Sequence, residues 1–145
     1  NKNLTFFTNY KSQKAKEIDE NPQVSCLFYW SSMEKQIRIS GTAKKSPQET
    51  SKKYFSMRPR NSQIAAWASK QSKEIKSKKN LIETYISYKK DYSKKEKIPY
   101  PDFWGGYDII PKSFEFWQGG LYRLHDRIKY KLEKNSQWKQ TRLSP

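Results

Sequence analysis

The segment with the most chemistry-bearing side chains lies between residues 115 and 127. Arg123, His125 and Arg127 alternate within it, and His125 is the only histidine of the chain. Guanidinium groups bind anions through forked hydrogen bonds, and an imidazole can donate, accept or carry a proton. The segment could therefore bind and orient an anionic substrate. Taken alone, an Arg-x-His pattern is more often a polar loop.

A second cluster has the residue types and spacing of a phosphate site. Tyr54, Arg58 and Ser62 follow one another at intervals of four residues across a helix end and its exit loop. Three donors on one side of this helix would suit a phosphomonoester, because arginine offers a fork that matches phosphate oxygens. By itself, this pattern too is more often part of an ordinary surface.

Metal chemistry is disfavoured, because the chain has 1 cysteine and 1 histidine. A zinc site built from these ligand types needs more of them, and we expect no metal. Cys26 lies in an apolar run at 24–30, where a small buried residue of a strand is the expected role.

Length and composition indicate one folded domain with a heavily charged surface. The chain has 145 residues, a formal net charge of +16, and 15% aromatic residues, too many for a disordered basic tail. In the densest basic region, 70–97, the tyrosines have the spacing of a core stripe and not of a base-stacking platform. Its positive charge comes mostly from lysine, whereas arginine is the residue that usually contacts base edges. This region therefore favours a solvated lysine-rich face. A nucleic-acid partner is therefore disfavoured. We also expect no membrane span and a cytoplasmic location.

Several short strands and a few helices must position these clusters. The strand at Gln36–Ala43 alternates Ile37 and Ile39 with polar residues, which predicts one apolar and one polar face. A capping box at Ser46 with Pro47 predicts the start of a helix. The other expected elements are strands at 4–10, 24–30, 104–110, 113–118, 127–132 and 138–143 and helices at 12–20, 46–57, 63–69 and 78–93, with a hairpin turn at 134–136.

This order of elements predicts the fold class. The strands do not alternate regularly with helices, which favours an antiparallel barrel or sandwich with helical additions. A doubly wound nucleotide-binding fold is disfavoured, because the chain has no glycine-rich phosphate loop.

Short segments spread over almost the whole chain form a specific series. They are 6–10, 28–30, 36–39, 54–59, 62–64, 71–72, 104–107, 116–119, 123–127 and 142–145. The most specific are Trp-Gln-Gly at 117–119 and Arg-Leu-His-Asp-Arg at 123–127. In this order, the series resembles the pyridoxine (pyridoxamine) 5'-phosphate oxidase family.

The resemblance implies an FMN-binding split β-barrel of Greek-key type, working as a homodimer with two flavin sites at the subunit interface. Residues 1–145 would form one domain that lacks the family's N-terminal segment, with the first strands and helices in 1–95 and the C-terminal strands in 104–145. The implied reaction oxidises pyridoxine 5'-phosphate or pyridoxamine 5'-phosphate to pyridoxal 5'-phosphate, with O2 as acceptor and H2O2 as product. Since the flavin supplies the redox chemistry, we infer hydride transfer from a substrate held against it.

Matching positions imply the site residues. The residues expected to contact FMN are Phe7, Thr8, Lys14, Gln36, Gln71, Ser72, Trp117 and Arg127. The substrate phosphate would bind Tyr54, Arg58 and Ser62. The substrate ring would contact Arg123, Leu124 and His125. Arg123 and His125 are the expected catalytic pair, which orients the ring, and Arg127 would stabilise negative charge on the reduced flavin. Where the family usually has arginine before the flavin-phosphate lysine, this chain has Gln13.

Two other interpretations remain open at this stage. One is a flavin-binding split-barrel protein without oxidase activity, which stores or carries FMN or pyridoxal phosphate. The other is a basic nucleic-acid-binding domain, which rests only on the lysine excess. Visible flavin absorption distinguishes the last from the first two, and peroxide release on adding pyridoxamine 5'-phosphate distinguishes the oxidase from the carrier.

Overall fold

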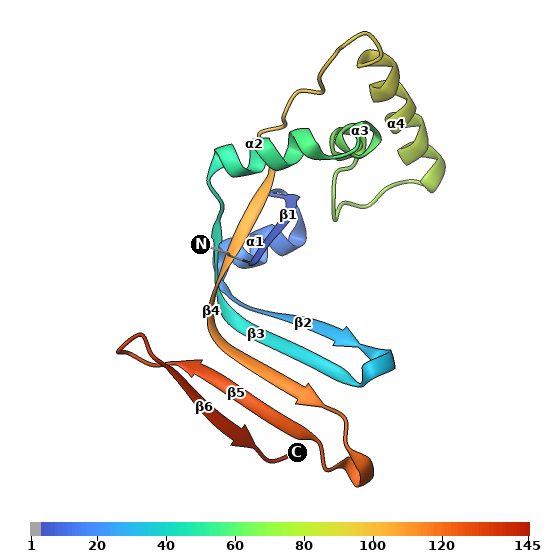
Figure 1. Ribbon diagram of the computed structural model, residues 1–145. Helices are drawn as coiled ribbons and strands as arrows, with labels where there is room; N and C mark the ends of the chain where they lie inside the picture. The colour runs from blue at the N-terminus through green and yellow to red at the C-terminus, as the bar shows by residue number, and fades with distance from the viewer. Residues whose placement is uncertain (1–3) are drawn as a thin grey trace. The chain divides into compact units, whose positions relative to one another are not determined.

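The computed structural model describes residues 4–145, which divide into two compact units. The sheet unit comprises Pro22–Lys44 and Ile109–Pro145, and the helical unit comprises Leu4–Asn21 and Lys45–Asp108. The elements follow in the order β1 (Leu4–Asn9), α1 (Gln13–Glu20), β2 (Gln23–Trp30), β3 (Lys35–Lys45), α2 (Gln48–Met57), α3 (Arg60–Ala68), α4 (Lys78–Asp91), β4 (Trp104–Gln118), β5 (Asp126–Leu132) and β6 (Trp138–Leu143), with 3₁₀ turns at Ser31–Met33 and Leu121–Arg123 (Figure 1).

The strands of the described residues form one 6-stranded sheet. Its order is β2-β3-β4-β5-β6, with β1 pairing β4. The pairs β2–β3, β4–β5 and β5–β6 are antiparallel, as expected from the sequence. The hairpin between β5 and β6 closes at 134–136, where the Glu133 N–H donates to the Gln137 carbonyl at 2.8 Å.

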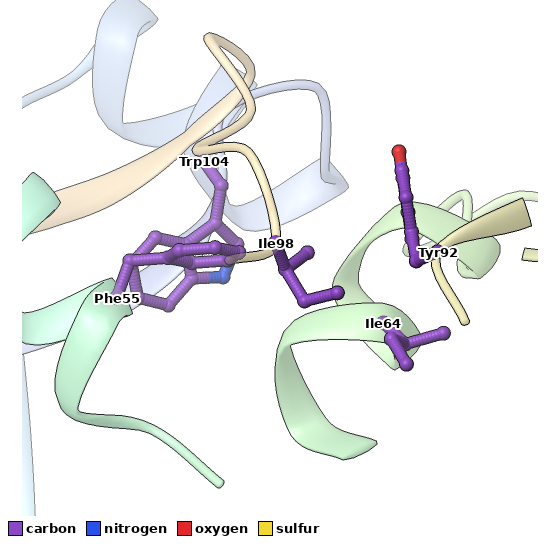
Figure 2. Packing of buried hydrophobic residues seen from close by; sticks show 5 residues of the cluster. All are labelled: Phe55, Ile64, Tyr92, Ile98 and Trp104. Carbon is purple, nitrogen blue, oxygen red and sulfur yellow. The ribbon is translucent and has the colours of Figure 1, made fainter. Parts of the chain in front are cut away.

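The core of the helical unit is aromatic. Its buried cluster consists of Phe55, Ile64, Tyr92, Ile98 and Trp104 (Figure 2). The tyrosines that recur at helical spacing on α4 pack against this cluster, and the Trp67 ring lies 6.3 Å from that of Tyr88 and 6.2 Å from that of Tyr92. The prediction that these tyrosines form a core stripe is confirmed, and the lysines of α4 lie on its other faces.

Helix α1 begins and ends as its sequence predicts. Ser12 is fully buried, and its Oγ accepts a hydrogen bond from the Ala15 N–H at 3.2 Å, which satisfies a free donor of the first turn. At the other end, the Asn21 N–H donates to the Glu17 carbonyl at 2.8 Å. This helix follows β1 directly and therefore holds the end of that strand.

The capping box predicted at Ser46 is wrong. The residue before α2 is Pro47, and no side chain caps the helix. The Ser46 hydroxyl instead donates to Asp108 Oδ1 at 2.8 Å, and Thr5 donates to the same oxygen at 2.7 Å. Asp108 is buried, and an unsatisfied buried carboxylate costs more than an uncapped helix end in water.

The two strands expected at 104–110 and 113–118 are one continuous strand, β4. Pro111 lies between the two expected segments, and a proline is tolerated in a strand where the ladder requires no N–H at that position. Gly41 of β3 lies against this point: a Cβ there would be 2.2 Å from the Ile110 carbonyl oxygen. The close approach of the two backbones needs glycine.

Three smaller expectations also change. Helix α3 begins at Arg60, directly after Pro59, instead of at residue 63. Cys26 lies in a strand as predicted but is only partly buried, because β2 is an edge strand whose Leu27 and Tyr29 are each 57% exposed. Among the helices of residues 4–145, none is long and apolar enough to cross a membrane.

Candidate active site

A cavity of about 460 Å³ opens in the helical unit beside β1. Aromatic rings form one wall of it: the Phe7 ring stacks on that of Tyr54, with centroids 3.9 Å apart and planes 10° apart, and on that of Trp104 at 5.3 Å. Five residues assigned to the site from the sequence line this cavity, namely Phe7, Thr8, Tyr54, Arg58 and Gln71.

Arg58 brings an unsatisfied positive charge to this cavity. Its guanidinium carbon lies 4.8 Å from the centre of the Trp104 ring, and its Nη1 is buried without a hydrogen-bond partner among residues 4–145. Burial lowers the pKa of Arg58, while the nearby Tyr54 acts in the opposite direction. An unpaired buried donor is costly, by about 1–3 kcal/mol or more for a charged group. An anionic ligand would remove this cost.

Gln71 is held at the cavity by β1. Its Oε1 accepts hydrogen bonds from Thr8 Oγ1 at 3.2 Å and from the Asn9 N–H at 3.0 Å. The carbonyl of the side chain is therefore occupied, and the amide nitrogen remains as a donor for a ligand. Ser72 follows with a φ of 65°, a left-handed backbone that non-glycine residues rarely adopt and that often occurs at functional sites.

Three further residues of the predicted set do not line this cavity: Lys14, Ser62 and Ser72. The Lys14 ammonium is 5.4 Å from the centre of the Phe6 ring, which is a lining residue. Gln13, at the position where the family usually has arginine, turns away and donates to Glu17 Oε1 at 2.8 Å on α1.

In the sheet unit, three predicted FMN contacts form a row across neighbouring strands. Strands β3 and β4 run in opposite directions (Figure 1), and the Gly119 N–H donates to the Glu34 carbonyl at 2.8 Å. From this pair we infer that Gln36 lies beside Trp117, two residues further along each strand. Trp117 in turn pairs with Arg127. Residues directly opposite each other share a face of the sheet. This polar face is the one that the alternation within residues 36–43 predicted.

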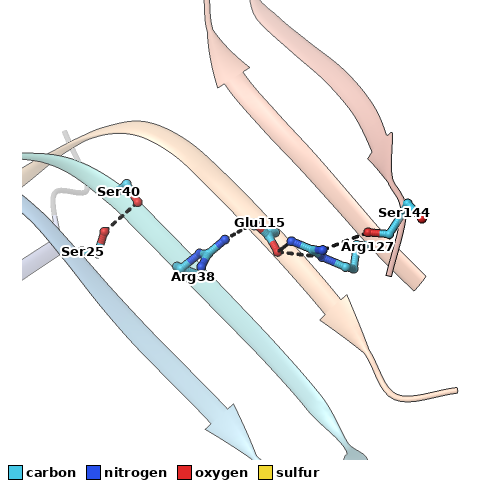
Figure 3. A network of polar contacts seen from close by, with 6 residues as sticks. All are labelled: Ser25, Arg38, Ser40, Glu115, Arg127 and Ser144. Atoms are coloured by element: carbon cyan, nitrogen blue, oxygen red, sulfur yellow. Dashed lines mark hydrogen bonds and ion pairs between the residues drawn. The ribbon is translucent and has the colours of Figure 1, made fainter. Parts of the chain in front are cut away.

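Glu115 is the residue of this face that the sequence reasoning missed. Its carboxylate binds Arg127 on one side and Arg38 on the other (Figure 3). Burial alone would raise the pKa of Glu115, but hydrogen bonds from the two arginines and their positive charges lower it. The available signal was its position two residues before Trp117, which places an acidic residue on the same face of the strand.

The turn after β4 presents the three residues assigned to the substrate ring. The His125 ring lies 4.8 Å from that of Trp117, and His125 Nδ1 accepts a hydrogen bond from the Gly120 N–H at 3.2 Å. Nε2 is then the ring nitrogen that can donate. Arg123 has a φ of 65°, and Leu124 is 73% exposed. An exposed apolar side chain next to a residue with strained backbone is typical of a binding segment.

The predicted residues thus form two groups, one in each unit, and two parts of the chain match models of known families. The family model described as pyridoxamine 5'-phosphate oxidase matches residues 1–87. A second model, the pyridoxine 5'-phosphate oxidase C-terminal dimerisation region, matches residues 104–145.

The chain belongs to the pyridoxamine 5'-phosphate oxidase family.

Relatives with this name cover nearly all of the chain. It is 51% identical over 142 residues to pyridoxine/pyridoxamine 5'-phosphate oxidase 2 of Hydrogenovibrio crunogenus, covering 98% of this chain and 66% of that protein. It is 48% identical over 145 residues to the pyridoxine/pyridoxamine 5'-phosphate oxidase of Pseudoalteromonas translucida, covering 100% of this chain and 68% of that protein. The chain therefore spans about two thirds of the length of these relatives.

Solved structures of the oxidase family confirm the predicted split-barrel fold. PhzG from Burkholderia lata, solved in complex with tetrahydrophenazine-1-carboxylic acid, superposes with a TM-score of 0.89 at 30% identity and covers 99% of this chain and 69% of that one. A pyridoxamine 5'-phosphate oxidase-related, FMN-binding protein from Nostoc punctiforme has a TM-score of 0.74 at 16% identity, covering 98% of this chain and 73% of that one, and supports the fold alone.

Proposed function

We propose that this protein is an FMN-dependent oxidase that converts pyridoxine 5'-phosphate or pyridoxamine 5'-phosphate to pyridoxal 5'-phosphate, with O2 as acceptor and H2O2 as product. Membership of the oxidase family and the names of its relatives support this reaction. The observation in the structure that carries the proposal is Arg58, whose buried Nη1 has no partner within residues 4–145 and lies at an aromatic-walled cavity. The phosphate of a phosphomonoester would accept a hydrogen bond from Arg58, and its planar ring would pack on the aromatic wall of the cavity.

The donors of the chain fit FMN, an anionic cofactor with a flat ring system. Gln71 and Thr8 stand at the helical-unit cavity with Lys14 near it, while Gln36, Trp117 and Arg127 form the row in the sheet unit. When bound, FMN supplies the redox chemistry of the reaction. Arg127, of which the side chain is 26% exposed, would hold positive charge beside the ring where negative charge develops. The FMN contacts of Phe7 and Ser72 are part of the same proposal.

The substrate would be held at two points. Tyr54 and Arg58 bind its phosphate, with Ser62 contributing from the first turn of α3. Arg123 and His125 orient the pyridine ring, with Leu124 against it, and His125 Nε2 donates because Nδ1 is already an acceptor. A substrate held in one orientation against the flavin would react in an effectively unimolecular step.

The working form would be a homodimer with FMN at the subunit interface. The match of residues 104–145 to a dimerisation region supports the dimer. We further propose that residues 1–145 act as one FMN-binding domain, and that the protein works in the cytoplasm with small-molecule partners only.

The test is a flavin spectrum and an aerobic turnover assay on purified protein supplied with FMN. We expect visible flavin absorption and peroxide release on adding pyridoxamine 5'-phosphate. Flavin binding without peroxide would instead support the non-catalytic carrier, and no flavin binding at all would reject both.

A substitution in the turn after β4 tests the assignment of the ring-binding residues. Changing Arg123 to leucine should lower kcat by roughly a hundredfold or more while FMN remains bound, because only orientation of the substrate is lost. Lys134→Leu, in the exposed turn between β5 and β6, is the matched control and should leave kcat unchanged. Unchanged turnover in Arg123→Leu would contradict this role.

A further inference from the structure

We propose that Glu115 is a positioning residue for the flavin site: it holds the Arg127 guanidinium in the orientation in which its free N–H groups face a ligand. This inference rests on the proposed function, since Arg127 is there assigned to FMN. It goes beyond that function in assigning a role to a residue that binds neither cofactor nor substrate.

The hydrogen bonds around Arg127 define its orientation. Nε and Nη2 donate to the same carboxylate oxygen of Glu115, at 3.0 and 2.7 Å, and Nη1 donates to the Ser144 carbonyl at 2.9 Å (Figure 3). A guanidinium is planar, so contacts along two of its edges fix its plane. These bonds use three of its five N–H groups. One N–H on each Nη nitrogen then remains for a ligand, as far as residues 4–145 are concerned.

The differences in burial indicate which partner holds the other. The side chain of Glu115 is 7% exposed, against 26% for Arg127 and 49% for Arg38. A buried carboxylate near the end of β4 therefore contacts two longer and more exposed side chains. It stands two residues before Trp117 and on the same face, directly behind the row of predicted FMN contacts.

The negative charge of Glu115 is surrounded by three positive charges. The carboxylate lies between two guanidinium groups, and Lys129 is its paired neighbour on β5. With Glu115 ionised, each arginine has an opposite charge in contact. Without that charge, three cations of this face would repel one another at short range, and Arg127 would turn toward solvent. The loss of Glu115 should therefore act on FMN through Arg127.

A double-mutant cycle tests this coupling through the affinity for FMN. The proteins are the natural chain, Glu115→Gln, Arg127→Leu and the double variant, and the dissociation constant is measured by quenching of FMN fluorescence. We expect each single change to raise the dissociation constant roughly tenfold, as expected for a lost charge-assisted contact. The double variant should bind no more weakly than Arg127→Leu alone, because Glu115 has no effect once its target is gone.

Two further variants serve as controls for misfolding. Glu133→Gln removes an exposed carboxylate in the same unit and should leave the FMN affinity unchanged. Glu115→Asp keeps the charge on a shorter side chain, and we expect an FMN affinity between those of the natural chain and Glu115→Gln. Thermal unfolding without FMN shows which variants are folded.

The outcomes separate this inference from the proposed function. If Glu115→Gln, folded, binds FMN as tightly as the natural chain while Arg127→Leu binds weakly, the positioning role is rejected and the proposed function stands. Additive effects in the double variant would also reject it, because a purely structural role of Glu115 adds to any other loss. If the natural chain binds no FMN, both proposals fail.

Discussion

At the scale of single residues, the helical unit keeps a costly side chain at its cavity. Arg58 stacks against Trp104, yet its Nη1 has no hydrogen-bond partner among the described residues. Such a group does not stabilise the free protein, because the water it lost on folding is not replaced. Residues that lower stability while serving a ligand are common at functional sites.

Replacing Arg58 by methionine should therefore separate binding from stability. We expect KM for pyridoxamine 5'-phosphate to rise at least tenfold with a smaller change in kcat, because phosphate binding is lost equally in the ground and transition states. The free energy of unfolding without ligand should not fall and should rise by up to about 1–3 kcal/mol, since the unpaired buried donor is removed while the methionine still packs on Trp104. Steady-state kinetics and urea unfolding measure the two effects.

The control for this prediction is Lys53→Met, which changes an exposed cation of the same helix. Its KM should equal that of the natural chain. A large loss of stability in Arg58→Met, or an unchanged KM, would contradict the role given to Arg58.

At the scale of elements, a glycine allows the close approach of strands β3 and β4. β3 and β4 approach so closely at Gly41 that any Cβ would lie 2.2 Å from one backbone carbonyl oxygen of β4. Both partners are backbone atoms, and neither can move away without breaking the pairing of the strands. The neighbouring Pro111 gives no ladder N–H, so the local pairing already has few hydrogen bonds to lose.

We therefore expect Gly41→Ala to destabilise the protein by about 1–3 kcal/mol or more, as overpacking of rigid groups does. Urea unfolding followed by tryptophan fluorescence measures the change. Lys44→Ala, on an exposed position of the same strand, should change the free energy of unfolding by less than about 0.5 kcal/mol. Equal effects of the two substitutions would show that the strands can separate at Gly41 without cost.

At the scale of the whole molecule, the sheet unit has an apolar face that its own residues do not cover. A cavity of about 560 Å³ on this face is lined by Phe114, Phe116, Ile128, Tyr130 and Trp138. Phe116 is 41% exposed and Trp138 is 43% exposed. Exposed apolar patches of this kind are typical of protein–protein contacts, and these residues lie within the matched dimerisation region.

Phe116→Asp should accordingly convert a dimer into a monomer, because a carboxylate in an apolar contact is desolvated without a partner. Light scattering after size-exclusion chromatography should give half the mass, and bound FMN should be lost with the dimer. Ile86→Asp, a 57% exposed isoleucine on α4 outside the dimerisation region, is the matched control and should stay dimeric. A dimeric Phe116→Asp would move the interface to another face.

The sequence by itself determined what depends on short-range chemistry. The cap at Ser12, the tyrosine spacing of α4 and the polar face of β3 follow from residues a few positions apart, and the structure confirms them. The family motifs also lie within short segments, so the split-barrel fold could be predicted from them. Tyr54 and Arg58 could be selected as a pair because they lie four residues apart at the end of one helix.

Only the tertiary structure decided the partners of charged side chains that are far apart in the chain. Ser46 prefers the buried Asp108 to its own helix, and Glu115 holds Arg38 from a strand 77 positions away. In each case desolvation decides: a buried carboxylate must take the nearest donors in space, and no local pattern reveals which donors those are.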